Sequence, residues 1–201
     1  MKTDVITVSS RGRKMENALE QADKMAAYKG LSGKDALHLR LLTEEMMSMM
    51  RSITGETEGK FWIEDENGTY ALHLQVNTRM DTVKRDQLLS ASTSGKNDSA
   101  RGLMGRLRDL FDRSADSDLA AVSSPFLHSG MMDHADPSTL GWEWSMVQYE
   151  SVLNAGVQRN DDEAREAWDE LEKSVVARVA DEVKVAIRGQ TVEMTIFKAI
   201  A

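Results

Sequence analysis

The sequence contains no cysteine and only two prolines among its 201 residues. The lack of cysteine excludes disulfides, thiolate metal ligands and a thiol nucleophile. Pro125 and Pro137 lie close together, so proline interrupts regular structure in only one part of the chain. No apolar run approaches the roughly 20 residues that a membrane-spanning helix needs, and the first residues lack the apolar core of a signal peptide. We therefore expect a soluble, cytoplasmic protein.

The charge is negative overall. Thirty-three acidic and 25 basic residues give a formal net charge of −8. This excess argues against a protein that wraps nucleic acid, because phosphate contacts are made mostly by lysine and arginine. The length suits one sizeable domain, which we expect to span residues 1–201.

Methionine is abundant, with 13 copies and a cluster at Met46, Met47, Met49 and Met50. Methionine fills irregular gaps in a core and also adapts to partner surfaces. We expect this cluster to fill the core rather than to form an exposed binding surface.

The first third of the chain predicts one strand followed by two helices. Apolar and polar residues alternate over residues 4–9, which is typical of a short strand. Apolar residues at helical spacing then predict a helix that ends at Gly30. A second helix is expected to begin at Ser32, whose hydroxyl can accept a free backbone N–H while Asp35 favours the positive helix end. It should run to about Ile53.

Two β-hairpins are predicted, one in the middle of the chain and one at its end. Asn67-Gly68 separates the apolar runs 60–63 and 70–76, and both turn residues tolerate a positive φ. The runs 183–187 and 191–197 flank a second short turn.

The chain between the hairpins carries weaker signals. Residues 77–100 lose periodicity and indicate a loop, residues 102–113 carry an apolar stripe that predicts a helix, and residues 114–141 are irregular. We expect two further helices, at about 142–154 and 161–179. Three tryptophans in these helices are expected to form a small core: Trp142, Trp144 and Trp168.

The order of predicted elements defines the fold class. Helices segregated from a mostly antiparallel sheet make an α+β two-layer sandwich.

Three stretches resemble the motifs of one nucleotide-binding superfamily. Residues 26–32 end a helix near a glycine and lead into a long helix, where Glu44 and Ser48 lie four residues apart on one face. Residues 95–105 run from a polar loop into a glycine-bearing helix start. This order resembles the GHKL, or Bergerat, fold of histidine-kinase-like ATPases, and most of all the anti-sigma factor serine kinase branch. The resemblance covers about residues 1–113 and 181–201, and implies that 114–180 are a largely helical insertion before the last hairpin.

The resemblance implies a role for each matching residue. Glu44 would be the catalytic base that activates the group attacking the γ-phosphate. Ser48 stands where the family has the asparagine that holds Mg²⁺, and Asn77 stands where it has the aspartate that binds adenine. The two glycines expected just after that aspartate are absent here. The stretch that would contact the phosphates of ATP includes Lys96, Arg101, Gly102, Leu103 and Gly105.

These departures favour one function over its alternatives. We expect a bacterial regulatory module of the anti-sigma factor type with weakened or lost ATP binding, which acts on a protein such as a sigma factor, an anti-sigma antagonist or a second copy of itself. The first alternative is an active ATP- and Mg²⁺-dependent protein serine kinase that uses the residues above. The second is an interaction protein that has the fold without the family's function.

Simpler interpretations of the same motifs stay open. Glu44-Glu45 can be a solvated helix face, and 102–105 can be an ordinary helix start after a loop. A metal site formed by the histidines and aspartates between His128 and Asp136 is a further alternative, although their spacing matches no established zinc pattern.

Overall fold

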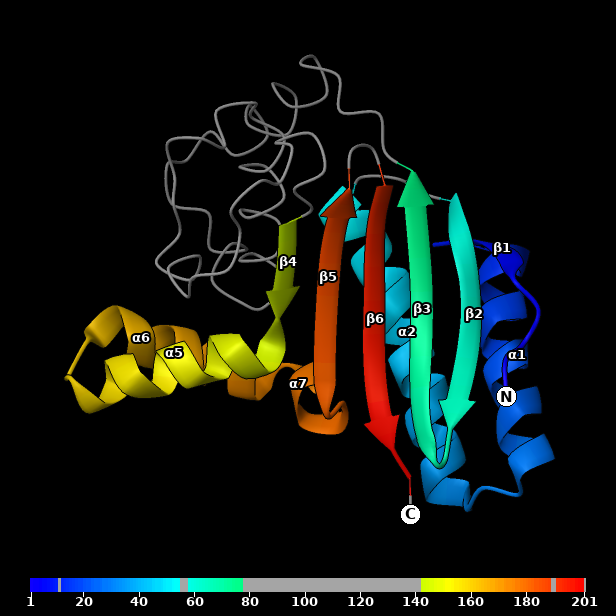
Figure 1. Cartoon of the computed structure of the whole chain (residues 1–201), viewed down its shortest axis with the longest axis horizontal. Helices are drawn as coiled ribbons and strands as arrows, with labels where there is room; N and C mark the ends of the chain where they lie inside the picture. The colour runs from blue at the N-terminus through cyan, green and yellow to red at the C-terminus, as the bar shows by residue number, and fades with distance from the viewer. Residues whose placement is uncertain (11, 55–57, 78–141, 189–190, 201) are drawn as a thin grey trace, which may run out of the picture.

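The computed structural model describes residues 1–10, 12–54, 58–77, 142–188 and 191–200 (Figure 1). These residues form an α+β structure with a six-stranded antiparallel sheet in the order β1-β2-β3-β6-β5-β4. The elements along the chain are β1 (Ile6–Ser9), α1 (Arg13–Lys29), α2 (Gly33–Thr54), β2 (Glu58–Glu66), β3 (Thr69–Asn77), β4 (Trp142–Ser145), α5 (Met146–Gln158), α6 (Asp162–Lys173), α7 (Val175–Val179), β5 (Glu182–Arg188) and β6 (Thr191–Ala199).

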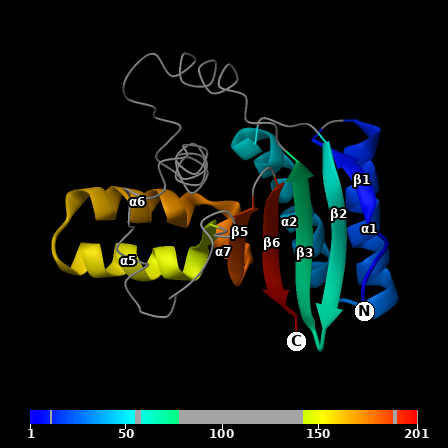
Figure 2. The ribbon, with the colours of Figure 1, turned by 45° about the horizontal axis from the view of Figure 1, so that its top comes forward.

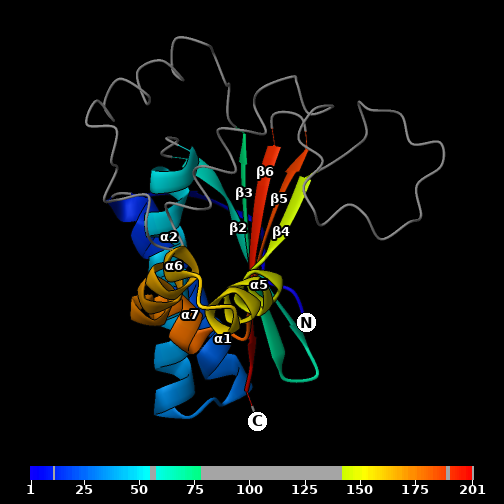
Figure 3. The same ribbon diagram turned by 90° about the vertical axis from the view of Figure 1, so that its left-hand side faces the viewer.

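The sheet and the helices form two layers. Helices α1 and α2 lie against one face of the sheet, whereas no helix of the described part of the chain covers the opposite face (Figures 1 and 3). The hairpin of α5 and α6 extends sideways from the β4–β5 side of the sheet (Figure 2). The predicted two-layer sandwich is therefore confirmed. None of the described helices is long and apolar enough to cross a membrane.

Both helix ends predicted near Gly30 and Ser32 are confirmed. Gly30 follows α1 in the left-handed conformation, with φ 64°, and its N–H bonds back to the last turn of the helix. The Ser32 hydroxyl accepts the N–H of Asp35 at 3.2 Å, which satisfies one of the free donors at the start of α2. The two helices are thereby joined by a short turn.

The core lies between α2 and the sheet. The buried apolar side chains of α2 are at most 2% exposed, and they are Leu39, Leu42, Met46, Met47, Met49 and Met50. On the sheet, Phe61, Ile63 and Leu72 are fully buried. The methionine cluster is thus part of the core, as expected.

Both predicted hairpins are present. Glu66 pairs with Thr69, so only Asn67 and Gly68 form the first turn, with φ values of 53° and 87°. Two consecutive residues with positive φ are typical of the type I′ turn that suits the twist of a hairpin. In the second hairpin Arg188 pairs with Thr191. Strand β6 then lies directly between β3 and β5, which brings the last strand of the chain into the middle of the sheet.

Two predicted helix boundaries were wrong. Residues 142–145 were expected to begin a helix, but they form β4, which pairs with β5, and Trp144 lies opposite Val185 with only 8% of its surface exposed. The sequence pattern did not predict this strand, because a segment of four residues fits a short strand as well as the first turn of a helix. The helix expected over 161–179 ends at Lys173, and α7 begins after Ser174, whose hydroxyl accepts the N–H of Ala177.

The predicted tryptophan core is confirmed in part. Trp144 is buried, and its ring meets that of Tyr149 at a centroid distance of 5.9 Å. Trp168 is partly buried against the main core, and its indole N–H donates to Glu172 at 2.8 Å. The side chain of Trp142 lies outside the described residues.

A carboxylate from β5 holds the start of α5. The carboxylate of Glu182 accepts the N–H groups of Met146 at 3.0 Å and Val147 at 3.3 Å, and its other oxygen accepts the Ser145 hydroxyl at 2.8 Å. This arrangement satisfies two of the free donors at the helix start. It also fixes the direction in which the α5–α6 hairpin leaves the sheet.

Replacing Glu182 with alanine should lower the free energy of unfolding by about 1–2 kcal/mol, the usual cost of losing a helix cap. Chemical denaturation followed by circular dichroism measures this loss. The exposed Glu143 on the neighbouring strand is the matched control, and Glu143→Ala should change stability by less than about 0.5 kcal/mol. Equal losses in the two variants would show that the Glu182 contacts do not hold the helix start.

Candidate functional site

Helix α2 has one buried face and one face open to solvent. Glu44 and Ser48 lie on the open face, as their spacing predicts, and Leu37 at the start of that face is 60% exposed. Glu45 is half-buried beside them. The helix therefore presents Glu44 to solvent at the position that the resemblance assigns to a catalytic base, while its opposite side forms the core.

Asn77 lies on the other side of the sheet from α2. The buried residues of β3 are Tyr70, Leu72, Leu74 and Val76, so the alternation of the strand turns Asn77 away from the helices. Its Oδ1 atom, the proposed adenine acceptor, instead accepts a hydrogen bond from the Thr191 hydroxyl at 3.1 Å. The structure brings Glu44 and Ser48 together but does not bring Asn77 to them.

The remaining predicted site residues belong to the segment between β3 and β4. Lys96, Arg101, Gly102, Leu103 and Gly105 lie outside the described residues, as do the histidines and aspartates of the alternative metal site. Within the described ranges, no group of three histidine, aspartate or glutamate side chains is arranged to hold a metal ion.

Asp65 is the only buried carboxylate among the described residues, with 5% of its surface exposed. Its oxygens accept Nζ of Lys29 at 2.5 Å and the N–H of Gly68 at 3.1 Å. The hydrogen bond from Lys29 outweighs burial and lowers the pKa of Asp65 below its ordinary value. This carboxylate ties the end of α1 to the first hairpin turn, which is a structural role.

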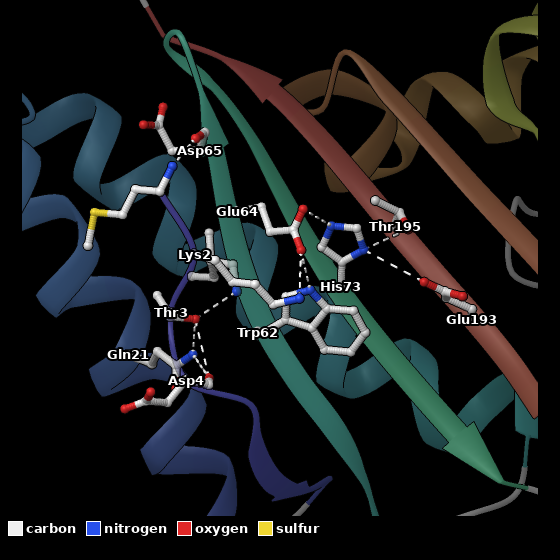
Figure 4. Close-up of polar contacts among 12 residues, drawn as sticks. Lys2, Thr3, Asp4, Gln21, Trp62, Glu64, Asp65, His73, Glu193 and Thr195 are labelled. Atoms are coloured by element: carbon white, nitrogen blue, oxygen red, sulfur yellow. Dashed lines mark hydrogen bonds and ion pairs between the residues drawn. The ribbon is translucent and has the colours of Figure 1, made fainter.

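The uncovered face of the sheet carries a polar and aromatic cluster around His73 (Figure 4). The His73 ring stacks on Trp62 with a centroid distance of 4.8 Å and an interplanar angle of 3°. Its Nδ1 atom lies 3.3 Å from the Thr195 hydroxyl. The sequence does not indicate this cluster, because Trp62, His73 and Thr195 become neighbours only through the register of three strands.

Two carboxylates flank the His73 ring on opposite sides. Nε2 lies 3.8 Å from Glu64 Oε2, and Nδ1 lies 3.8 Å from Glu193 Oε1. The other oxygen of Glu64 accepts Nζ of Lys2 at 2.9 Å and the indole N–H of Trp62 at 3.0 Å. Nζ of Lys2 also lies 5.0 Å from the centre of the Trp62 ring, within cation–π range.

Contacts within the cluster and burial lower the pKa values of Glu64 and His73. The hydrogen bond from Lys2 lowers the pKa of Glu64, so this carboxylate stays ionised. Burial lowers the pKa of His73 below its ordinary 6.5, and the nearby Glu64 and Glu193 charges only partly oppose it. At neutral pH the cluster therefore holds a neutral imidazole between two carboxylates.

Comparison with known proteins adds no family to these observations. A scan against protein-family models finds no match to the chain, and a search of curated proteins finds none either.

Proposed function

We propose that the chain is a bacterial regulatory module of the histidine-kinase-like ATPase type, in which ATP binding is weakened or lost and which acts by binding another protein. The observation that carries this proposal is that Asn77 faces the uncovered side of the sheet, whereas Glu44 and Ser48 face solvent on the outer side of α2. By resemblance, the partner is a sigma factor or an anti-sigma antagonist, or a second copy of the chain.

The order and packing of the elements support the GHKL part of the proposal. A first strand and a helix ending at Gly30 precede α2, and a hairpin follows it, in the order that the resemblance implies. Glu44 and Ser48 lie on the side of α2 that is open to solvent, where a ligand can reach them. This exposure leaves both side chains available to a ligand, as the GHKL proposal requires.

The chemistry of the two positions supports the weakening of ATP binding. Mg²⁺ requires near-octahedral oxygen coordination, and the single hydroxyl of Ser48 is a poorer ligand than an amide oxygen. The Asn77 oxygen is already hydrogen-bonded to Thr191 and points away from α2. A hydrogen bond contributes about 0.5–1.5 kcal/mol, so losing the adenine contact and part of the metal coordination would weaken binding by roughly tenfold to a hundredfold.

The active serine kinase remains the second candidate. Its supporting observation is that Glu44, the base in this mechanism, is exposed rather than used in the core. Here Ser48 would hold Mg²⁺, and Lys96, Arg101 and the Gly102 amide would contact the phosphates of ATP. Transfer of the γ-phosphate to a serine of the partner would then depend on Glu44.

The partner assay separates the two candidates. Purified bacterial sigma factors and anti-sigma antagonists are tested for binding to the full chain by biolayer interferometry, with and without Mg-ATP, and for phosphate incorporation. We expect micromolar or tighter binding of one of these proteins, unchanged by Mg-ATP and unchanged in Glu44→Ala. Phosphorylation of an antagonist that is lost in Glu44→Ala would instead establish the kinase. Binding to none of these proteins would contradict the proposed partner class.

A further inference from the structure

We propose that protonation of His73 changes the polar contacts of its ring on the uncovered face of the sheet. When the ring is neutral it stacks on Trp62, and when it takes up a proton the imidazolium is held between Glu64 on β2 and Glu193 on β6. This inference rests on the geometry of the cluster and does not depend on the proposed function.

The positions of the two carboxylates carry the inference. Glu64 faces Nε2 and Glu193 faces Nδ1, each at 3.8 Å, so the two acids approach different ring nitrogens. A neutral imidazole has one N–H and can donate to only one of them, whereas an imidazolium donates from both nitrogens. The two acids also cannot share one metal ion bound to a single ring nitrogen. A proton is therefore the ligand that this pair of acids fits.

The ring also has an unused position for a proton. Nε2 is buried, and it has no hydrogen-bond partner within the part of the chain that the structure describes. The His73 side chain is only 15% exposed, so water satisfies this nitrogen poorly. Protonation at Nε2 would give it a charged acceptor in Glu64, after a small movement of the Glu64 side chain toward the ring.

Among the residues that the structure describes, the charged groups around the ring come from the N-terminal segment, β2, β6 and β5. Glu64 and Glu193 favour the imidazolium, whereas Lys2 from the N-terminal segment opposes it. On β5, Lys184 lies opposite Thr195 on the same face. Trp62 and Thr195 contribute no charge, and the burial that they provide favours the neutral ring. Both states are therefore accessible, and the change between them occurs on the acid side of neutrality.

The lowered pKa of His73 makes folding stability depend on pH. Because burial lowers the pKa of His73 in the folded protein, the unfolded chain binds the proton more readily as the pH falls through 6.5. Folding stability is complete above this pH and declines below it until the folded protein is protonated too. The two carboxylates limit this decline by stabilising the imidazolium.

The test is an NMR titration of the histidine rings between pH 8 and pH 4.5 in the ¹⁵N-labelled full chain. Glu64→Gln and Glu193→Gln keep the size of each side chain, and glutamine at position 64 can still accept the Trp62 N–H. We expect the His73 midpoint to lie below 6.5 in the parent protein and to fall further in each variant. The ring of His38, on α2, is the internal control.

An unchanged His73 midpoint in both variants would overturn the proposal, because the carboxylates would then not hold the proton. A parent His73 that titrates at the ordinary 6.5 with no change in the resonances of Trp62, Glu64 or Glu193 would also overturn it. Circular dichroism of each variant at pH 8 confirms that a shifted midpoint is not caused by unfolding.

Discussion

Replacing Phe61 with alanine is expected to lower the free energy of unfolding by about 3–5 kcal/mol, the usual cost of removing a buried phenylalanine. Phe61 lies on β2, is fully buried and faces the layer of helices. Domains of this size are stable by about 5–15 kcal/mol, so the variant should be close to unfolding under mild denaturation. Guanidinium denaturation followed by circular dichroism measures the loss.

The neighbouring Trp62 provides the matched control. Its side chain is larger but lies on the uncovered face of the sheet, half-buried against His73. Trp62→Ala should therefore cost less than half as much as Phe61→Ala, because most of the ring is not in the core. A loss at Trp62 equal to that at Phe61 would show that the second face is covered in solution, which would contradict the two-layer arrangement.

Met47→Ala is expected to lower the free energy of unfolding by about 2–5 kcal/mol. Met47 on α2 is fully buried and belongs to the hydrophobic core, where its flexible side chain fills space. The same denaturation experiment measures the effect, and the fraction of folded protein at 37 °C gives a second measure.

Glu44→Ala is the control on the open face of the same helix. Because Glu44 is exposed, this change should alter stability by less than about 0.5 kcal/mol. The difference between the two variants tests whether α2 has one structural face and one face available to a ligand. Destabilisation by Glu44→Ala comparable to that of Met47→Ala would place Glu44 in the core and remove it as a candidate base.

The hairpins and the first two helices could be predicted because their signals are local. Asn67-Gly68 fixes the first turn by its tolerance of positive φ, and Gly30 and Ser32 mark helix ends through their own backbone and hydroxyl groups. Strand β4 could not be predicted in this way. Its four residues become a strand because β5, about 40 residues later in the chain, offers an edge for pairing.

The candidate site likewise contains residues that local sequence places and residues that only the pairing of distant strands brings together. Glu44 and Ser48 share a face because helical spacing alone places them there. The orientation of Asn77 follows from the alternation of Tyr70, Leu72, Leu74 and Val76 along its strand, whereas the similarity of the motif contains no information on which face of the sheet it occupies. The His73 cluster could not be foreseen, because Glu193 and Thr195 reach it only when β6 inserts beside β3.

The most direct test of the central claim is calorimetric titration of Mg-ATP and Mg-ADP into the purified full chain. We predict no binding at submillimolar nucleotide, and measurable binding only when Ser48→Asn restores the amide ligand for Mg²⁺. Glu44→Ala and Gly102→Ala are the accompanying variants. Micromolar binding of Mg-ATP that is lost in Gly102→Ala would contradict the claim, because it would show a working nucleotide site.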